Sequence, residues 1–143
     1  MKKIVLDTNC LLMSLPKASP YRLLWDSFLK GDVVLCVSNE MMEEYTEILS
    51  LKVGERIASN VVELIINHPN VELVNPTYRF GLIQSDVDDN KFVDCAIVAG
   101  AMCIVSNDSH FKELVSIPFP KVTVFNIIEF MSVLRNLNRN SDN

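Results

Sequence analysis

The sequence predicts a three-layer α/β/α sandwich with a mostly parallel, about five-stranded sheet. Short apolar runs of strand length alternate with segments of helical periodicity, in the order β-α-β-α-α-β-α-β-α-β-α. The runs at 4–6 and 33–37 are apolar throughout, which is typical of strands buried on both faces of a parallel sheet. The chain has 143 residues, of which 49% are hydrophobic and 22% charged, and this fits one globular domain.

The first half of the chain supplies two strands and three helices. The boundaries between them are marked by Gly31 as a helix end, by Ser38 or Asn39 as a helix cap, and by Gly54 as a break in periodicity. We expect a strand at 4–6, a loop with Pro16 and Pro20, a helix at 20–30, a strand at 33–37, a helix from 39 to about 51 and a helix at 53–67.

The second half supplies the remaining elements. We expect an edge strand at 71–74, a long loop at 75–88, a helix at 92–102, a strand at 103–106, a short helix from 109, a strand at 122–125 and a last helix capped by Asn126 and running to about Leu134. The domain should therefore span residues 1–135, and the polar tail at 136–143 should fray.

Composition narrows the class of protein. No apolar run approaches the roughly 20 residues of a membrane span, and Asp7 interrupts the only N-terminal run that could serve as a signal peptide. We therefore expect a cytoplasmic protein with no membrane contact. The formal net charge of −5 argues against strong nonspecific binding of nucleic acid, but acids gathered around a cation would lower the charge of a nuclease too. The four cysteines occur singly and should be buried free thiols.

Two acids come from the first half of the chain. Asp7 directly follows the strand at 4–6, and a strand end of this kind lies at the carboxyl edge where open α/β sheets bind ligands. The helix after the second strand carries four glutamates, and Glu44 is the one nearest to its apolar face. Asp7 could instead cap a local turn, and Glu44 could be a flank residue of an amphipathic helix.

Three aspartates precede the helix at 92–102. Helix capping explains one of them, Asp86 or Asp88, but it explains all three poorly. Asp89 shares a helix face with small and apolar residues, so it should lie at the buried end of the helix, where an acid needs a partner. Asp94 falls on the other side of the helix and is expected either to face solvent or to support the site.

A second strand also ends in an acid. Residues 104–108 read Ile-Val-Ser-Asn-Asp, so Asp108 should reach the same sheet edge as Asp7, with Asn9 and Ser106 as supporting polar groups. Several converging carboxylates repel one another unless a cation enters, and oxygen ligands suit Mg²⁺ or Mn²⁺. We expect no histidine in this ligand set: His110 follows Asp108 by two residues and could lie near the site, but a structural role is favoured for it.

These segments together resemble the PIN domain family, most closely the group described as toxin components of toxin-antitoxin systems. The resemblance rests on the motifs at 4–9, 44–45, 86–92 and 104–108 and on Ala96 and Gly100, and it covers residues 3 to about 134. It implies a parallel-sheet α/β/α fold and a ribonuclease that uses Mg²⁺ or Mn²⁺. One departure is Ser106-Asn107-Asp108, where the family more often has Thr-Gly-Asp or Thr-x-Asp.

Residue by residue, the resemblance implies catalytic and metal-binding roles for Asp7, Glu44, Asp89 and Asp108, with Asn9, Ser106 and Asp94 in support. It further implies an RNA substrate, an antitoxin protein as partner, and a homodimer. The substrate backbone could be steered by basic residues that the sequence cannot place, namely Lys17, Arg22, Arg79, Lys91 and Lys112.

Two other functions are compatible with the same acids. Asp7 could be the nucleophile of a phosphatase-like α/β enzyme, although such enzymes usually carry a second aspartate where this chain has Asn9. The domain could also be non-catalytic, with an acid cluster that binds only a structural cation or a partner. Turnover of RNA separates both alternatives from a nuclease.

Overall fold

The fold is built on one five-stranded sheet in which every neighbouring pair of strands is parallel. The structure, a computed structural model, describes residues 2–141. The strands are β1 (Lys2–Leu6), β2 (Val33–Val37), β3 (Val71–Leu73), β4 (Cys103–Val105) and β5 (Val124–Phe125). Their order is β3-β2-β1-β4-β5, so β1 is central and Ile4 pairs with Leu35 on one side and with Cys103 on the other.

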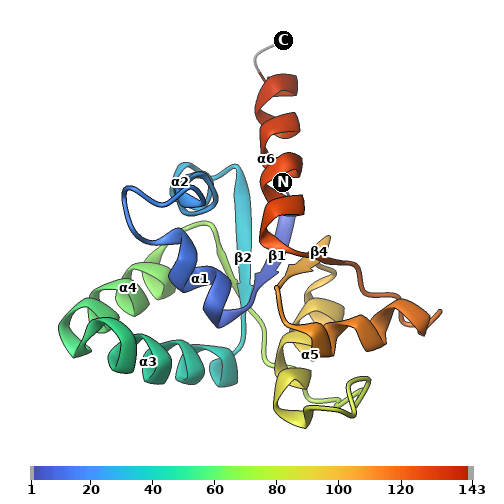
Figure 1. The fold of residues 1–143 in the computed structure, drawn as a ribbon. Coiled ribbons are helices and arrows are strands. Elements are labelled where there is room, and N and C mark those ends of the chain that lie inside the picture. Colours follow the sequence, from blue (N-terminus) through green and yellow to red (C-terminus); the bar gives the residue numbers. More distant parts are fainter. Residues whose placement is uncertain (1, 142–143) are drawn as a thin grey trace.

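Helices cover both faces of the sheet and confirm the expected sandwich (Figure 1). They are α1 (Thr8–Ser14), α2 (Arg22–Lys30), α3 (Asn39–Val53), α4 (Glu55–Asn67), α5 (Asn90–Ala99) and α6 (Ile127–Ser141), with short 3-10 helices η1 (Val87–Asp89) and η2 (Ser109–Ser116). Helix α5 packs on β1, β2 and β4, whereas α2 packs on β2 and α6 across the sheet. Helices α3 and α4 pack on each other as a hairpin.

Local caps explain where several helices begin and end. The Ser38 hydroxyl accepts a hydrogen bond from the Met41 amide at 3.2 Å, which confirms the expected start of α3. Helix α2 ends at Gly31 with φ 91°, a left-handed conformation that favours glycine. Asn126 and Glu129 each accept the backbone N–H of the other, at 2.8 and 2.9 Å, and this capping box begins α6.

The main miss of the sequence prediction is α1, which replaces the loop expected directly after β1. The Asp7 carboxylate accepts from the Asn9 amide and caps the helix, while Cys10 and Leu11 bury its inner face. Helix α5 also ends earlier than expected, and α6 continues to Ser141 rather than ending near Leu134. The last two residues of the expected polar tail lie outside the described residues.

The core lies between the sheet and its helices. The last three residues of β1, Ile4, Val5 and Leu6, are buried, and all four cysteines are buried free thiols, as expected. Within residues 2–141, no helix has the length and apolarity that a bilayer crossing requires. The few buried polar side chains include Asp7 and Ser106, which stand at the ends of β1 and β4.

Candidate metal centre

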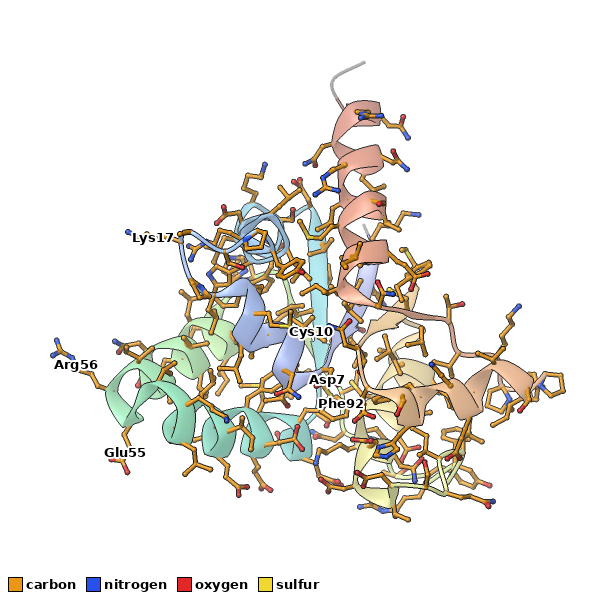
Figure 2. The ribbon with its side chains drawn as sticks, in the orientation of Figure 1. Asp7, Cys10, Lys17, Glu55, Arg56 and Phe92 are labelled. Atoms are coloured by element: carbon orange, nitrogen blue, oxygen red, sulfur yellow. The ribbon has the colours of Figure 1, made fainter. Side chains whose placement is uncertain are left out.

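Asp7 is the most deeply placed acid of the site. It lies where β1 ends and α1 begins, with α3 and α5 on either side (Figure 2). Only 8% of the residue is exposed. Its Oδ1 accepts the Asn9 amide at 3.0 Å and its Oδ2 accepts the Ser106 hydroxyl at 2.5 Å. Each carboxylate oxygen thus has one fixed donor, and the plane of the carboxylate is held in place.

Ser106 joins the ends of β1 and β4. While its hydroxyl donates to Asp7, the same oxygen accepts the Asp108 amide at 3.0 Å. Asp108 in turn caps η2 by accepting the His110 amide at 2.9 Å. The acids at the ends of two adjacent strands are therefore brought to one place, as the sequence pattern predicts.

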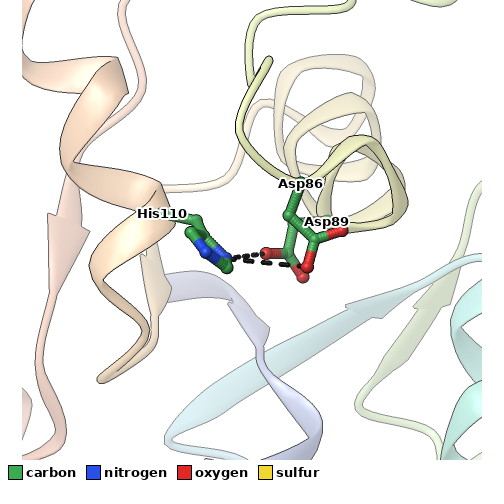
Figure 3. A group of neighbouring side chains, drawn as sticks. All are labelled: Asp86, Asp89 and His110. Atoms are coloured by element: carbon green, nitrogen blue, oxygen red, sulfur yellow. Dashed lines mark hydrogen bonds and ion pairs between the residues drawn. The ribbon is translucent and has the colours of Figure 1, made fainter.

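Asp89 reaches this place from η1, at the start of α5. Its Oδ2 lies 3.2 Å from His110 Nδ1, and the same nitrogen lies 3.6 Å from Asp86 Oδ2 (Figure 3). Asp108 Oδ1 also lies 3.1 Å from this nitrogen. Ligand atoms of Asp86, Asp89 and His110 lie within 4.8 Å of one another, a spacing that a metal ion could bridge. The imidazole thus faces three carboxylates.

Glu44 stands on the opposite flank of the site and is already partnered. Its Oε1 lies 2.7 Å from Lys91 Nζ, and its Oε2 accepts the Thr8 hydroxyl. The Lys91 side chain is only 10% exposed and also contacts Asp88 at 3.1 Å. Helix α3 therefore delivers Glu44 to the site as one half of a largely buried ion pair.

The structure separates Asp94 from these acids. Asp94 is buried and accepts the Phe80 amide at 3.2 Å, in the loop that precedes η1. In the same loop, the Asn90 side chain both accepts from the Ile83 amide and donates to its carbonyl, each at 2.9 Å. Asp94 and Asn90 thus fix the loop that leads to Asp86 and Asp89, rather than facing the other acids.

Electrostatics show that the site is short of positive charge. Burial raises the pKa of Asp7, and the nearby charges of Glu44 and Asp108 raise it further. Burial also raises the pKa of Asp89 to about 6, against the hydrogen bond from His110, which lowers it; the nearby charges of Asp86, Asp108 and Asp7 raise it as well. Carboxylates with raised pKa values favour a cation, so the donor set fits a divalent metal.

Two of the five basic residues considered for the substrate backbone lie near these acids. Lys91 is held by Glu44 and Asp88, whereas Lys112 lines a cleft of about 440 Å³ whose wall includes Asp108. By contrast, Arg79 pairs with Glu40 at 2.8 Å on an exposed surface. Lys112 is thus the better placed of these cations to meet a substrate.

Sequence reasoning assigned no role in the site to Thr8 or Asp86, considered Lys91 only for contact with the substrate backbone, and favoured a structural role for His110. His110 stands two residues after Asp108, so a capped turn returns its side chain toward that carboxylate. Lys91 stands two residues after Asp89 in the chain, but its contact is with α3. The first contact could be inferred from spacing, while the second depends on how α3 and α5 pack.

A protein-family profile matches most of this chain, and solved structures resemble its fold. The profile of the family described as PIN domain matches residues 3–110. No curated protein matches the chain.

Three solved structures illustrate the likeness in fold. VapBC2 from Rickettsia felis bound to a DNA fragment from their promoter gives a TM-score of 0.60 at 14% identity, over 87% of this chain and 98% of that one. VapBC from Salmonella typhimurium, bound to DNA, gives 0.57 at 17% identity, over 89% and 99%. The PIN domain endonuclease Utp24 gives 0.53 at 17% identity, over 87% and 84%.

Proposed function

The chain belongs to the PIN domain family, and we propose that it is a metal-dependent endoribonuclease that hydrolyses RNA phosphodiesters. The observation that carries the proposal is the junction of β1 and β4, where Ser106 joins Asp7 and Asp108 by hydrogen bonds of 2.5 and 3.0 Å. Asp89 adds a third carboxylate whose pKa the other two acids help to raise.

In this proposal, Mg²⁺ or Mn²⁺ is held by Asp7, Glu44, Asp89 and Asp108, with Asn9, Ser106 and Asp94 in support. The bound ion supplies an activated water and offsets negative charge on the phosphodiester. The protein itself orients the ligands. The donors from Asn9 and Ser106 occupy one lone pair on each Asp7 oxygen and leave the others available.

Glu44 differs from the other acids because protein contacts already hold both of its carboxylate oxygens. Its two oxygens are fixed by Lys91 and Thr8, so the carboxylate keeps its place without a metal ion. Carboxylate oxygens accept more than one partner, and Glu44 can therefore contribute to a metal site while it remains paired. The position of Lys112 beside Asp108 suits contact with an adjacent phosphate of the RNA backbone.

The test is cleavage of RNA by purified protein with Mn²⁺ or Mg²⁺, compared with Asp7→Asn and with the matched control Asp26→Asn. Asp26 forms an exposed ion pair with Arg22 on α2, outside the site. We expect cleavage by the wild type and the control and a loss of at least about 100-fold in Asp7→Asn, since an anionic ligand is removed. Equal cleavage by both variants would contradict the assignment.

We further propose that the protein is the toxin of a type II toxin-antitoxin pair, acting in the cytoplasm and bound by an antitoxin protein. The likeness to chains of VapBC and of FitAcB from Neisseria gonorrhoeae supports this step. A homodimer is part of the same proposal. Expression should arrest growth, and co-expression of an adjacent small reading frame should restore it. Growth arrest by Asp7→Asn as strong as that by the wild type would contradict the link between toxicity and cleavage.

A further inference from the structure

The imidazole of His110 occupies an unusual position among the acids. Its Nδ1 lies 3.1, 3.2 and 3.6 Å from carboxylate oxygens of Asp108, Asp89 and Asp86, which come from β4's end and from the segment before α5. No other nitrogen of a histidine is near, because His68 stacks on Phe28 and accepts the Asn70 amide. The site therefore has one borderline-soft donor among hard oxygen donors.

The backbone holds this imidazole over the site. The His110 amide donates to Asp108 Oδ1 at 2.9 Å, which fixes the backbone of His110 beside the acids as part of the cap of η2. The His110 side chain is 39% exposed, against 15% for Asp89, which leaves room for an ion to enter from solvent. Unlike Glu44, the carboxylates that face His110 have no lysine or arginine partner among the described residues.

We propose that His110 is a nitrogen ligand of the bound metal and that it makes the site prefer Mn²⁺ to Mg²⁺. The inference rests on the proposed function for the existence of the metal centre, and it adds which ion the centre selects. Asp89 and Asp108 would supply oxygen ligands beside the His110 nitrogen. An all-oxygen set would not discriminate in this way.

The selectivity follows from the chemistry of the donor. Imidazole nitrogen suits first-row transition metals, whereas Mg²⁺ keeps oxygen ligands and several waters. A single nitrogen added to carboxylates should raise the affinity for Mn²⁺ and leave that for Mg²⁺ nearly unchanged. Replacing His110 by a residue with only an oxygen donor should therefore equalise the two ions.

The direct test is electron spin-echo envelope modulation of Mn²⁺ bound to the protein at fixed pH. Wild type should show ¹⁴N modulation from a coordinated imidazole, and His110→Gln should lose it. His68→Gln is the matched control and should keep the modulation. Absence of ¹⁴N modulation in the wild type, or its persistence in His110→Gln, would overturn the proposal.

Binding titrations give a second measurement. His110→Gln should weaken Mn²⁺ binding by at least about tenfold and Mg²⁺ binding by less than about threefold. His110→Asp, which restores an anionic oxygen donor, should bind Mg²⁺ at least as well as the wild type and show no ¹⁴N modulation. Equal weakening of both ions by His110→Gln would contradict the selectivity. Circular dichroism in EDTA checks that each variant is folded.

The two proposals fail in different ways. If a nitrogen coordinates Mn²⁺ but the protein does not cleave RNA, the His110 ligand is supported and the ribonuclease proposal is contradicted. If the protein cleaves RNA with Mn²⁺ but shows no ¹⁴N modulation, the ribonuclease proposal is supported and the His110 ligand is contradicted.

Discussion

The two flanks of the acidic site differ in how their negative charge is balanced. On one flank, Glu44 is neutralised by Lys91 at 2.7 Å and held by Thr8. On the other, carboxylate oxygens of Asp89 and Asp108 lie 3.2 and 3.1 Å from the imidazole of His110. The protein itself thus balances the charge of Glu44, whereas Asp89 and Asp108 form no ion pair with a lysine or arginine among residues 2–141.

This difference indicates where a cation would gain most. Burial of a charged carboxylate is costly unless a partner offsets it, and the pKa of Asp89, raised to about 6, reports that cost. For Glu44, the largely buried ion pair with Lys91 already offsets the cost of burying the carboxylate. A divalent ion should therefore depend more on Asp89 and Asp108 than on Glu44.

The largest expected effect is on metal-induced stabilisation, in a comparison of Asp89→Asn with Glu44→Gln. Saturating Mn²⁺ at about 100 times its Kd should raise the free energy of unfolding of the wild type by about 2.7 kcal/mol. Asp89→Asn should lose most of this gain, and Glu44→Gln should keep more than half of it. Thermal melts with and without Mn²⁺ measure both, and equal losses in the two variants would remove the contrast between the flanks.

The next effect concerns pH in the absence of metal. The pKa of Asp89 rises from an ordinary value of 3.8 to about 6 in the folded protein. Between pH 4 and 6 the folded state therefore binds more protons than the unfolded state, and stability falls as pH increases. We expect the free energy of unfolding in EDTA to fall by about 1–2 kcal/mol across that window. Asp89→Asn should reduce this fall, and the remainder should come from Asp7 and Asp94, whose pKa values burial also raises. Urea denaturation at pH 4, 6 and 8 measures it.

Asp26→Asn serves as the control for this pH dependence, because its carboxylate pairs with Arg22 and its side chain is 48% exposed. It should follow the wild-type profile. A wild-type stability that rises from pH 4 to 6 would show that the charge of Asp89 is already balanced within the protein.

A smaller effect is expected at the hydroxyl that joins the two strand ends. Ser106→Ala removes the donor to Asp7 and the acceptor for the Asp108 amide, at a cost of about 1 kcal/mol in free energy of unfolding. Because the Ser106 hydrogen bond lowers the pKa of Asp7, its loss should raise that pKa further and weaken Mn²⁺ binding at pH 6 more than at pH 8. Isothermal titration at the two pH values measures this, and an unchanged affinity at both would contradict the role of Ser106.

The smallest effect is expected at Lys91, the partner of Glu44. Lys91→Met removes a positive charge 2.7 Å from Glu44 and should increase Mn²⁺ affinity by about threefold, since less positive charge then opposes the ion. The same titration measures it. A fall in affinity would mean that Lys91 aligns Glu44 more than it competes with the metal.

The apolar runs in the sequence correctly predicted the two adjacent strands that end at Asp7 and Asp108. The apolar runs that end in Asp7 and Asp108 form the adjacent strands β1 and β4, and Ser38 and Asn126 cap helices as expected. These features are local or follow from the parallel order of the sheet. The ribonuclease activity and the roles of the individual acids remain predictions.

Contacts between elements could not be predicted in the same way. Helix α1 was missed because the prolines at 16 and 20 suggested a loop, although Asp7 itself caps the helix. The Lys91–Glu44 pair depends on the packing of α5 against α3, which no periodicity in either segment specifies. Asp94 was expected to face solvent or to support the site; it is buried, and its bond to the Phe80 amide depends on the path of a long loop.

The central claim is that Asp7, Asp89 and Asp108 gather around one divalent ion. A crystal soaked in Mn²⁺ and measured for anomalous scattering tests it most directly. We expect one strong anomalous peak within coordination distance of Asp89 and Asp108, on the side of the site away from Lys91. No peak among these three aspartates, with ordered Mn²⁺ only on the outer surface of the protein, would contradict the claim.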